Sequence, residues 1–264
     1  MRFLIFGDIV GKIGRRALQQ ALPDIRRELR PDIIIANAEN IAHGLGMTEK
    51  TLADALDAGV TIFTGGNHLW DKPEGVEILR QPNSPVIRPA NYPAGAPGSG
   101  WTMLSVAGKS VLVINLLGRV FMRELVDCPF RAFDAALAQP TTKPDITIVD
   151  FHAEATSEKN AFGWYADGRA AIVYGTHTHV PTADERVLTK GTAFISDIGM
   201  TGARDTVIGV DPASVLPQYL TGIGTRFTWP EIGVATINAI VVDVDPTSGC
   251  ATNIKRIHRE ITIN

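Results

Sequence analysis

The chain has 264 residues, of which 45% are hydrophobic and 20% are charged, and this composition predicts a globular protein with a substantial core. The formal net charge of −3 provides no broad basic field, which argues against non-specific binding to nucleic acid or to an anionic membrane surface. No apolar stretch is long enough to span a bilayer, so we expect no membrane partner.

Two further features favour a cytoplasmic location. Cys128 and Cys250 lie far apart and form no CxxC pair, a usage typical of proteins whose thiols stay reduced. The N-terminal run MRFLIFGDIVG has only Arg2 as a basic residue before its short apolar segment. We interpret this run as a buried strand and not as a signal peptide.

The first part of the chain alternates short apolar runs with helical patterns. In chain order it predicts a strand at 2–7, a helix at 15–29, a strand at 32–37, a helix at 48–59 and a strand at 60–65. We expect Pro23 to bend or restart the first helix, and the second helix to open at Thr48. This βαβαβ order indicates parallel strands joined by crossover helices.

The remainder is predicted to add mainly strands. Proline and glycine punctuate residues 82–100, which we interpret as an irregular connection. Then follow strands at 110–118, 144–152, 169–177 and 191–196, a helix at 130–139, and a terminal hairpin of 231–245 with 251–263. No internal repeat or linker divides the sequence, so we expect one α/β domain spanning residues 1–264.

Polar side chains follow five of the predicted strands. They are Asp8, Glu39 with Asn40, Asn67 with His68, His152, and His177 with His179. Because the carboxyl ends of parallel strands line one edge of a sheet, we expect these side chains to meet there. Alternate residues of a strand share a face, so His177 and His179 should also lie on one side.

These residue types are the ones that a pair of divalent ions needs. Carboxylate, amide and imidazole groups bind such ions, and one carboxylate can bridge two of them. Asp8 and Glu39 carry two negative charges against the four positive charges of two ions. The excess positive charge would attract a phosphate ester and lower the pKa of a bound water. Taken singly, Asp8 could instead cap a helix and His152 could be a buried core histidine, but the five strand ends together favour a metal centre.

The sequence resembles the calcineurin-like metallophosphoesterases over almost its whole length. The blocks GDIVG (7–11), GGNH (65–68), DFHAE (150–154) and GTHTH (175–179) follow one another in the order of that family. The first block lacks the histidine of the usual DxH motif, and Glu39 with Asn40 replaces the usual aspartate of the second. These departures resemble the YmdB-like branch, whose members are bacterial phosphodiesterases acting on cyclic nucleotides that include 2′,3′-cyclic AMP.

The resemblance implies a four-layer αββα sandwich, in which two stacked mixed sheets are flanked by helices. It also implies two metal ions, with iron or manganese favoured and magnesium as an alternative. Site 1 would consist of Asp8, Glu39, Asn40 and His179. Site 2 would consist of Glu39, Asn67, His152 and His177, with Glu39 bridging the two ions.

We therefore predict a metal-dependent phosphoric diester hydrolase acting on a small phosphodiester or cyclic nucleotide. A hydroxide bridging the ions would attack phosphorus, and His68 would act as the general acid for the leaving oxygen. His68 could instead hold a ligand in place by a hydrogen bond. The sequence does not assign roles to His43, Trp70, Asp71 and Arg204, and it leaves open a homo-oligomer.

Two alternatives remain at this stage. The same metals could serve a phosphomonoesterase or a phosphodiesterase that acts on RNA, although the acidic net charge disfavours a long polyanion. In a different class, the chain could be a regulatory binding protein with a vestigial metal site. A substrate panel tests the first alternative, and analysis of bound metal tests the second.

Overall fold

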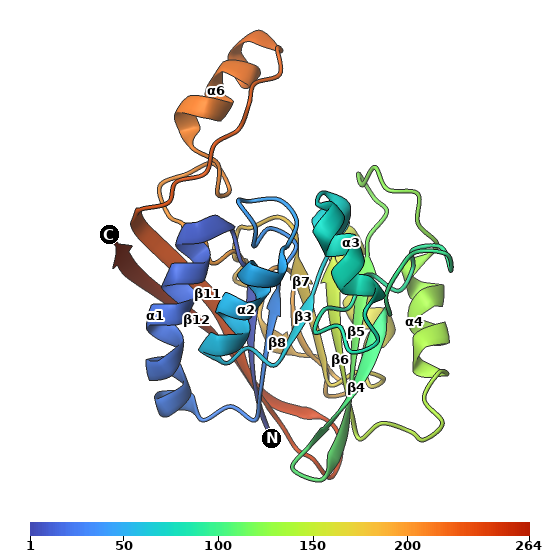
Figure 1. Cartoon of the computed structure of the whole chain (residues 1–264). Coiled ribbons are helices and arrows are strands. Elements are labelled where there is room, and N and C mark those ends of the chain that lie inside the picture. The colour runs from blue at the N-terminus through green and yellow to red at the C-terminus, as the bar shows by residue number, and fades with distance from the viewer.

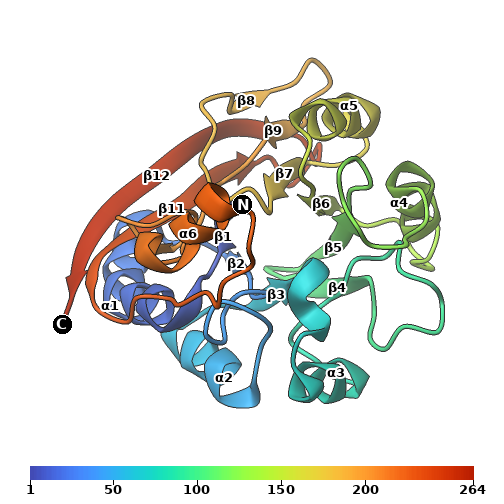
Figure 2. The same ribbon diagram turned by 90° about the horizontal axis from the view of Figure 1, so that it is seen from above.

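The structure, a computed structural model, describes residues 1–264 and contains two six-stranded sheets packed face to face (Figures 1 and 2). The first sheet has the order β10-β11-β1-β2-β3, with β12 paired to β11. Its strands are β1 (Arg2–Asp8), β2 (Ile33–Asn37), β3 (Ile62–Thr64), β10 (Gly202–Ala203), β11 (Gly233–Val244) and β12 (Ala251–Ile263). Strands β1, β2 and β3 are parallel and β11 is antiparallel to β1, so the sheet is mixed. The predicted βαβαβ unit and terminal hairpin are confirmed.

The second sheet has the order β4-β5-β6-β7-β9-β8. Its strands are β4 (Trp101–Val106), β5 (Lys109–Leu117), β6 (Ile146–His152), β7 (Ile172–Thr176), β8 (Arg186–Val187) and β9 (Ala193–Ile195). Strands β5, β6, β7 and β9 are parallel, whereas β4 and β8 are antiparallel to their neighbours. The edge strand β4 was not expected because its alternation of apolar and polar residues is broken between Met103 and Leu104.

Helices cover the outer faces of both sheets. Helices α1 (Gly11–Leu29) and α2 (Glu49–Ala58) pack on the first sheet, and α4 (Pro129–Leu137) and α5 (Thr156–Ala166) pack on the second. A third apolar cluster lies between the sheets. In β1, Phe3 and Ile5 face the inter-sheet cluster while Leu4 and Phe6 face the helices. Burial on both faces explains the continuous apolar run, and the predicted αββα sandwich is confirmed.

Several helices differ from the prediction. Helix α1 begins at Gly11 and runs through Pro23 without interruption, so proline does not restart it. Thr48 caps α2 as expected, its hydroxyl accepting a hydrogen bond from the Thr51 amide. The short helices η1 (Asn67–Trp70), α3 (Pro73–Arg80) and α6 (Pro212–Thr221) were missed, as was α5. In α5 the apolar residues do not gather on one face, which removes the periodic signal.

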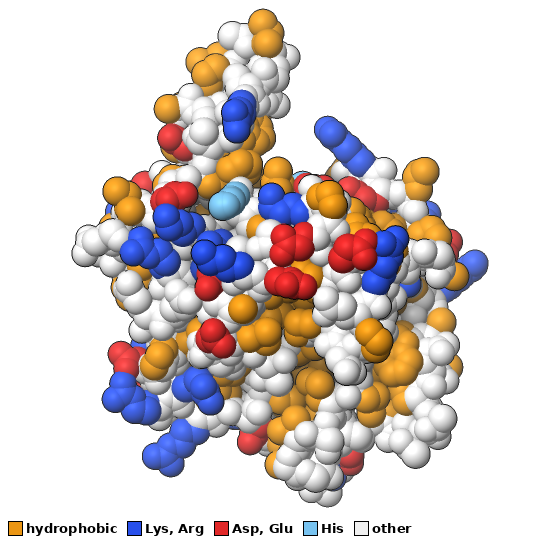
Figure 3. All heavy atoms as spheres, viewed as in Figure 1, with side chains coloured by type: hydrophobic (Ala, Val, Ile, Leu, Met, Phe, Trp, Pro, Cys, Tyr) orange, Lys and Arg blue, Asp and Glu red, His pale blue; other side chains and the backbone are white.

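Helix α6 heads an arm that projects from the body of the sandwich (Figure 1). Hydrophobic side chains gather on this arm (Figure 3), including Tyr219 at 74% exposure and Leu220 at 83%. No helix of the chain is both long enough and apolar enough to cross a membrane. Cys128 and Cys250 are half-buried and form no disulfide, as expected.

Candidate metal centre

The structure brings together residues from the carboxyl ends of strands in both sheets. Asp8 ends β1, Glu39 and Asn40 follow β2, Asn67 opens η1 after β3, His152 ends β6, and His177 and His179 follow β7. Four of these side chains are buried, namely Asp8, Glu39, Asn40 and His152. Such burial of polar side chains is unfavourable unless each has a partner.

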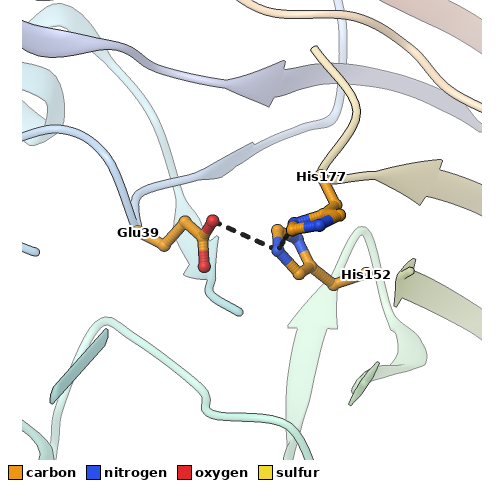
Figure 4. Close-up of side chains that lie close together, drawn as sticks. All are labelled: Glu39, His152 and His177. Atoms are coloured by element: carbon orange, nitrogen blue, oxygen red, sulfur yellow. Dashed lines mark hydrogen bonds and ion pairs between the residues drawn. The ribbon is translucent and has the colours of Figure 1, made fainter. Parts of the chain in front are cut away.

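The tightest group consists of Glu39, His152 and His177 (Figure 4). One donor atom from each lies within 4.8 Å of the others. The His152 Nε2 atom is 3.1 Å from Glu39 Oε1, 3.1 Å from His177 Nδ1 and 3.1 Å from Asn67 Oδ1. One carboxylate oxygen, one amide oxygen and two imidazole nitrogens therefore lie close together.

Hydrogen bonds on the far side of each ring determine which nitrogen carries the proton. The Thr176 hydroxyl donates to Asp150 Oδ1 at 2.7 Å, so it accepts from His152 Nδ1 at 2.8 Å. The His177 Nε2 atom lies 3.1 Å from Glu154 Oε2, and a carboxylate can only accept. In these tautomers His152 Nε2 and His177 Nδ1 both carry lone pairs and face each other. A cation between them satisfies both.

A second group lies beside the first and contains Asn40, His179 and Asp8. His179 donates from Nδ1 to the Ile208 carbonyl at 2.8 Å, which directs its Nε2 toward Asn40 Oδ1 at 3.3 Å. The Asn40 amide nitrogen donates to the Gly44 carbonyl at 3.0 Å, so its oxygen is the free atom. Asp8 accepts from the His177 amide at 3.1 Å through Oδ2, while its buried Oδ1 has no hydrogen-bond partner.

Glu39 belongs to the first group and lines the same cavity as Asn40 and His179 of the second. Its Oε1 atom faces His152, and its Oε2 atom accepts a hydrogen bond from the His68 amide at 3.0 Å. The adjacent Gly66 matters because a Cβ atom at that position would collide with Glu39 Oε2 and His152 Nε2. Glycine thus keeps space open next to the donor atoms. The unpartnered Asp8 oxygen, this space and the facing lone pairs together fit bound divalent ions.

The electrostatics of the cluster indicate competition between a proton and a metal ion. Burial opposes the charge of His152, but Glu39 raises the pKa of His152 to about 9. Burial likewise opposes the charge of Glu39, and His152 lowers the pKa of that carboxyl to about 2. Burial, aided by the charge of His152, lowers the pKa of His177 to about 3, and burial also raises the pKa of Asp8. Metal binding requires the proton on His152 to leave.

His68 lies at the mouth of this centre. Its Nδ1 atom is 2.7 Å from Asp71 Oδ2, and its side chain is about one-third exposed. A cavity of about 210 Å³ opens here, and its lining includes Glu39, Asn40, His68, His177 and His179. Since Nδ1 pairs with a carboxylate, Nε2 is the ring atom left to meet a ligand.

The expectation that His177 and His179 share one face of a strand is wrong. Strand β7 ends at Thr176, and both histidines lie in a loop with left-handed φ values of 95° and 64°. Residues other than glycine adopt this conformation uncommonly, and such strain often accompanies functional sites. The loop sends the two rings to different groups, with His177 toward His152 and His179 toward Asn40.

Several supporting residues were missed by the sequence reasoning. Asp150 is fully buried, burial raises its pKa to about 7, and it accepts hydrogen bonds from Asn37, Thr64 and Thr176. Lys159 and Asp197 form a buried ion pair at 2.7 Å. Asp197 also accepts from Thr178, the residue between the two histidines. A single acidic residue inside the apolar strand β6 was the available signal for Asp150.

Three residues of undetermined role contribute nothing to the 210 Å³ cavity. Trp70 packs edge-on against Tyr92 with ring centroids 5.2 Å apart. Arg204 pairs with Glu260 at 2.9 Å and with its neighbour Asp205. His43 lines a separate cavity. Asp71, by contrast, contacts His68 directly.

Comparison with known proteins adds independent evidence. A family model described as YmdB-like protein matches residues 4–257. The chain is 45% identical to the 2′,3′-cyclic-nucleotide 2′-phosphodiesterase of Bacillus subtilis (strain 168), over 97% of this chain and 96% of that protein. The crystal structure of a hypothetical protein from Thermus thermophilus matches with a TM-score of 0.92 at 42% identity, covering 98% of this chain and 99% of the other. A novel phosphatase from Mycoplasma pneumoniae matches with a TM-score of 0.93 at 32% identity, covering 100% of this chain and 94% of the other.

Proposed function

The chain belongs to the YmdB-like protein family, and we propose that it is a metal-dependent phosphodiesterase that opens 2′,3′-cyclic nucleotides. The observation that carries this proposal is the cluster of Glu39, His152 and His177, whose donor atoms lie within 4.8 Å of one another. The similarity to the Bacillus subtilis 2′,3′-cyclic-nucleotide 2′-phosphodiesterase supports the choice of substrate.

We propose two ions, held by the two groups of residues described above. Asp8, Glu39, Asn40 and His179 would hold one ion, and Glu39, Asn67, His152 and His177 would hold the other. When bound, the ions supply a nucleophile derived from water and positive charge for the phosphate. Nitrogen and oxygen donors without thiolate suit iron or manganese, and magnesium is the alternative.

The residues of the chain have distinct tasks in this proposal. Glu39 links the two groups, and the Thr176 and Glu154 hydrogen bonds hold the His152 and His177 rings in their required tautomers. Water adds to phosphorus while the bond between phosphorus and the 2′ oxygen breaks, which leaves a nucleoside 3′-phosphate. His68 Nε2 would donate the proton that the departing 2′ oxygen needs.

The cavity favours a small substrate. Its volume of about 210 Å³ is below the range of roughly 300–1,000 Å³ typical of sites that enclose a drug-sized ligand. A cyclic phosphate with its ribose would fill it, and the base would remain outside. We therefore infer a substrate that presents a small terminal phosphate group to this cavity.

The direct test is a substrate panel in which 2′,3′-cyclic AMP, p-nitrophenyl phosphate and RNA are each assayed with manganese, iron and magnesium. We expect fastest turnover of the cyclic nucleotide, with a nucleoside 3′-phosphate as product. Faster turnover of p-nitrophenyl phosphate or of RNA would favour the alternative activities on the same site.

A matched pair of variants separates a working metal centre from a vestigial one. Glu39→Gln should lose bound metal together with activity, because it removes the carboxylate shared by both groups. Glu77→Gln changes an exposed carboxylate on α3 and should keep both. Wild-type protein that binds no metal, even with manganese added, would instead indicate a binding protein.

His68 provides a separate prediction. His68→Ala should lower kcat by about 10²–10⁴-fold, the usual contribution of general acid–base catalysis, while metal content stays at the wild-type value. Asp71→Asn should have a smaller effect of the same kind, since Asp71 acts on the reaction only through its 2.7 Å contact with His68. Near-normal turnover by the His68 variant would eliminate the general-acid role.

A further inference from the structure

A second, larger cavity lies away from the metal centre. It has a volume of about 600 Å³ and lies between α3, the irregular segment 81–100, the start of β4, and α4. None of the proposed metal ligands lines it. Its volume is within the range of sites that enclose small organic molecules.

The unusual feature of this cavity is Arg88. This residue is only 7% exposed, and its one side-chain hydrogen bond runs from Nη1 to the Pro89 carbonyl at 2.7 Å. Its buried Nε atom has no partner, and no carboxylate lies within ion-pair distance of the guanidinium. A guanidinium stays charged in proteins, so this is a buried and uncompensated positive charge.

The rest of the lining adds no negative charge to the cavity. Arg80 also lines it, with its guanidinium paired to Glu77 on α3, and no aspartate or glutamate lines it, although the chain as a whole carries an excess of acidic residues. Hydrogen-bonding groups come from Gln81, Ser84 and Gln139, and Trp101 supplies an aromatic ring. The unpaired Arg88 with neutral polar groups and a ring is suited to a small anion with a planar body.

We propose that this cavity is a binding site for a small organic anion whose phosphate or carboxylate pairs with Arg88. The anion supplies the missing countercharge, and the Nη–H groups of Arg88 that do not bond to the Pro89 carbonyl offer the donors that such anions accept. The body of the ligand lies against Trp101 and the alanines of α4. The proposal concerns a site separate from the metal centre and does not depend on the proposed reaction.

Isothermal titration calorimetry on the metal-loaded protein can count the sites with inorganic phosphate, adenosine 3′-monophosphate and benzoate as probes. Phosphate compounds should bind at two sites per chain in the wild type. Glu39→Gln should keep only the cavity site, and Arg88→Met should keep only the metal-centre site. Benzoate binding that depends on Arg88 would identify a carboxylate as the natural group, and adenosine monophosphate binding would identify a phosphate ester.

Thermal melting distinguishes a ligand-binding arginine from a structural one. Without probe, Arg88→Met should melt at or above the wild-type temperature, because it removes an uncompensated buried charge. Arg88→Lys retains the charge without the planar fork and should weaken probe binding at least tenfold, which tests the site even if the methionine variant does not fold. Arg27→Met, an exposed position paired with Asp24, is the control and should bind as the wild type does. Unchanged probe binding in both Arg88 variants, or no binding outside the metal centre, would overturn the proposal.

Discussion

The substitution Thr176→Val tests whether the hydrogen bonds behind the ligands hold the proposed metal centre together. Thr176 is fully buried, and its hydroxyl bridges His152 Nδ1 at 2.8 Å and Asp150 Oδ1 at 2.7 Å. Valine has nearly the same shape but cannot form either bond. The His152 ring then loses the partner that directs its Nε2 lone pair toward Glu39 and His177.

The expected magnitude follows from the geometry. Loss of a partner that orients a metal-bound histidine typically lowers metal affinity by about 10- to 100-fold, which corresponds to ~1.4–2.7 kcal/mol. The His152 Nδ1–H group also becomes a buried donor without an acceptor, which lowers the free energy of unfolding by about 1–3 kcal/mol. For a chain of this length each kcal/mol lowers the melting temperature by roughly 2–4 °C.

Thr64→Val is the matched control. Thr64 is equally buried and donates to the other oxygen of Asp150, but its side chain forms no hydrogen bond with a proposed ligand. Both variants should lose stability, whereas only Thr176→Val should lose metal affinity, as measured by competition with a chelator of known affinity. Equal metal affinity in the two variants would refute the idea that Thr176 sets the tautomer of His152.

Two further predictions concern Gly66 and Asp184. The substitution Gly66→Ala adds a Cβ atom that would collide with the carboxylate of Glu39. We expect the Gly66 variant to lose bound metal, as measured by elemental analysis. The control is Gly95→Ala, whose Cβ meets nothing within 4 Å and which should retain its metal. Full metal content in the Gly66 variant would contradict this account. Burial opposes ionisation of Asp184, but hydrogen bonds led by the one from Ser196 lower its pKa below 3.8. Its contribution to stability is therefore present above pH ~3.8 and lost as the pH falls through the lower folded value, so the melting-temperature deficit of Asp184→Asn should shrink below pH ~4. A deficit that is constant from pH 6 to pH 3 would show that the charge of Asp184 is not responsible.

The sequence predicted the strands of the sandwich well because they are buried on both faces. In β1 the consecutive residues Phe3 and Leu4 face opposite sides of the sheet and pack into different apolar clusters. The whole strand is therefore apolar and easily recognised in the sequence. The polar residue that ends each run was then conspicuous, as with Asp8 and His152. Helix α5 shows the reverse case, since its buried face includes Lys159 and Gly163 while Trp164 and Tyr165 are exposed, which leaves no periodic apolar pattern in the sequence.

The supporting contacts of the site could not be predicted in the same way. Thr176 and Asp150 are separated by 26 residues in the sequence, and their contact depends on the parallel pairing of β6 and β7. The backbone conformation of the His177–His179 loop could not be predicted from the local sequence either. A glycine signals a left-handed φ value, whereas a histidine does not. The identity of the ligand atoms is thus encoded locally, but their orientation is encoded by tertiary contacts.

A common principle explains how donors from five strand ends converge with so few charges. In each of His152, His177 and His179 one ring nitrogen is committed to an acceptor outside the cluster, a hydroxyl, a carboxylate and a backbone carbonyl respectively. The side-chain nitrogen of Asn40 donates in the same way to the Gly44 carbonyl, so its neutral oxygen is left to face His179. Each of these outward hydrogen bonds leaves one lone pair of the side chain directed toward the cluster. Forming it requires little additional ordering, because its partner is already fixed in the folded structure. Loss of one such hydrogen bond should therefore loosen one proposed ligand while the sandwich stays folded. Metal affinity is thus a more sensitive measure of this site than thermal stability.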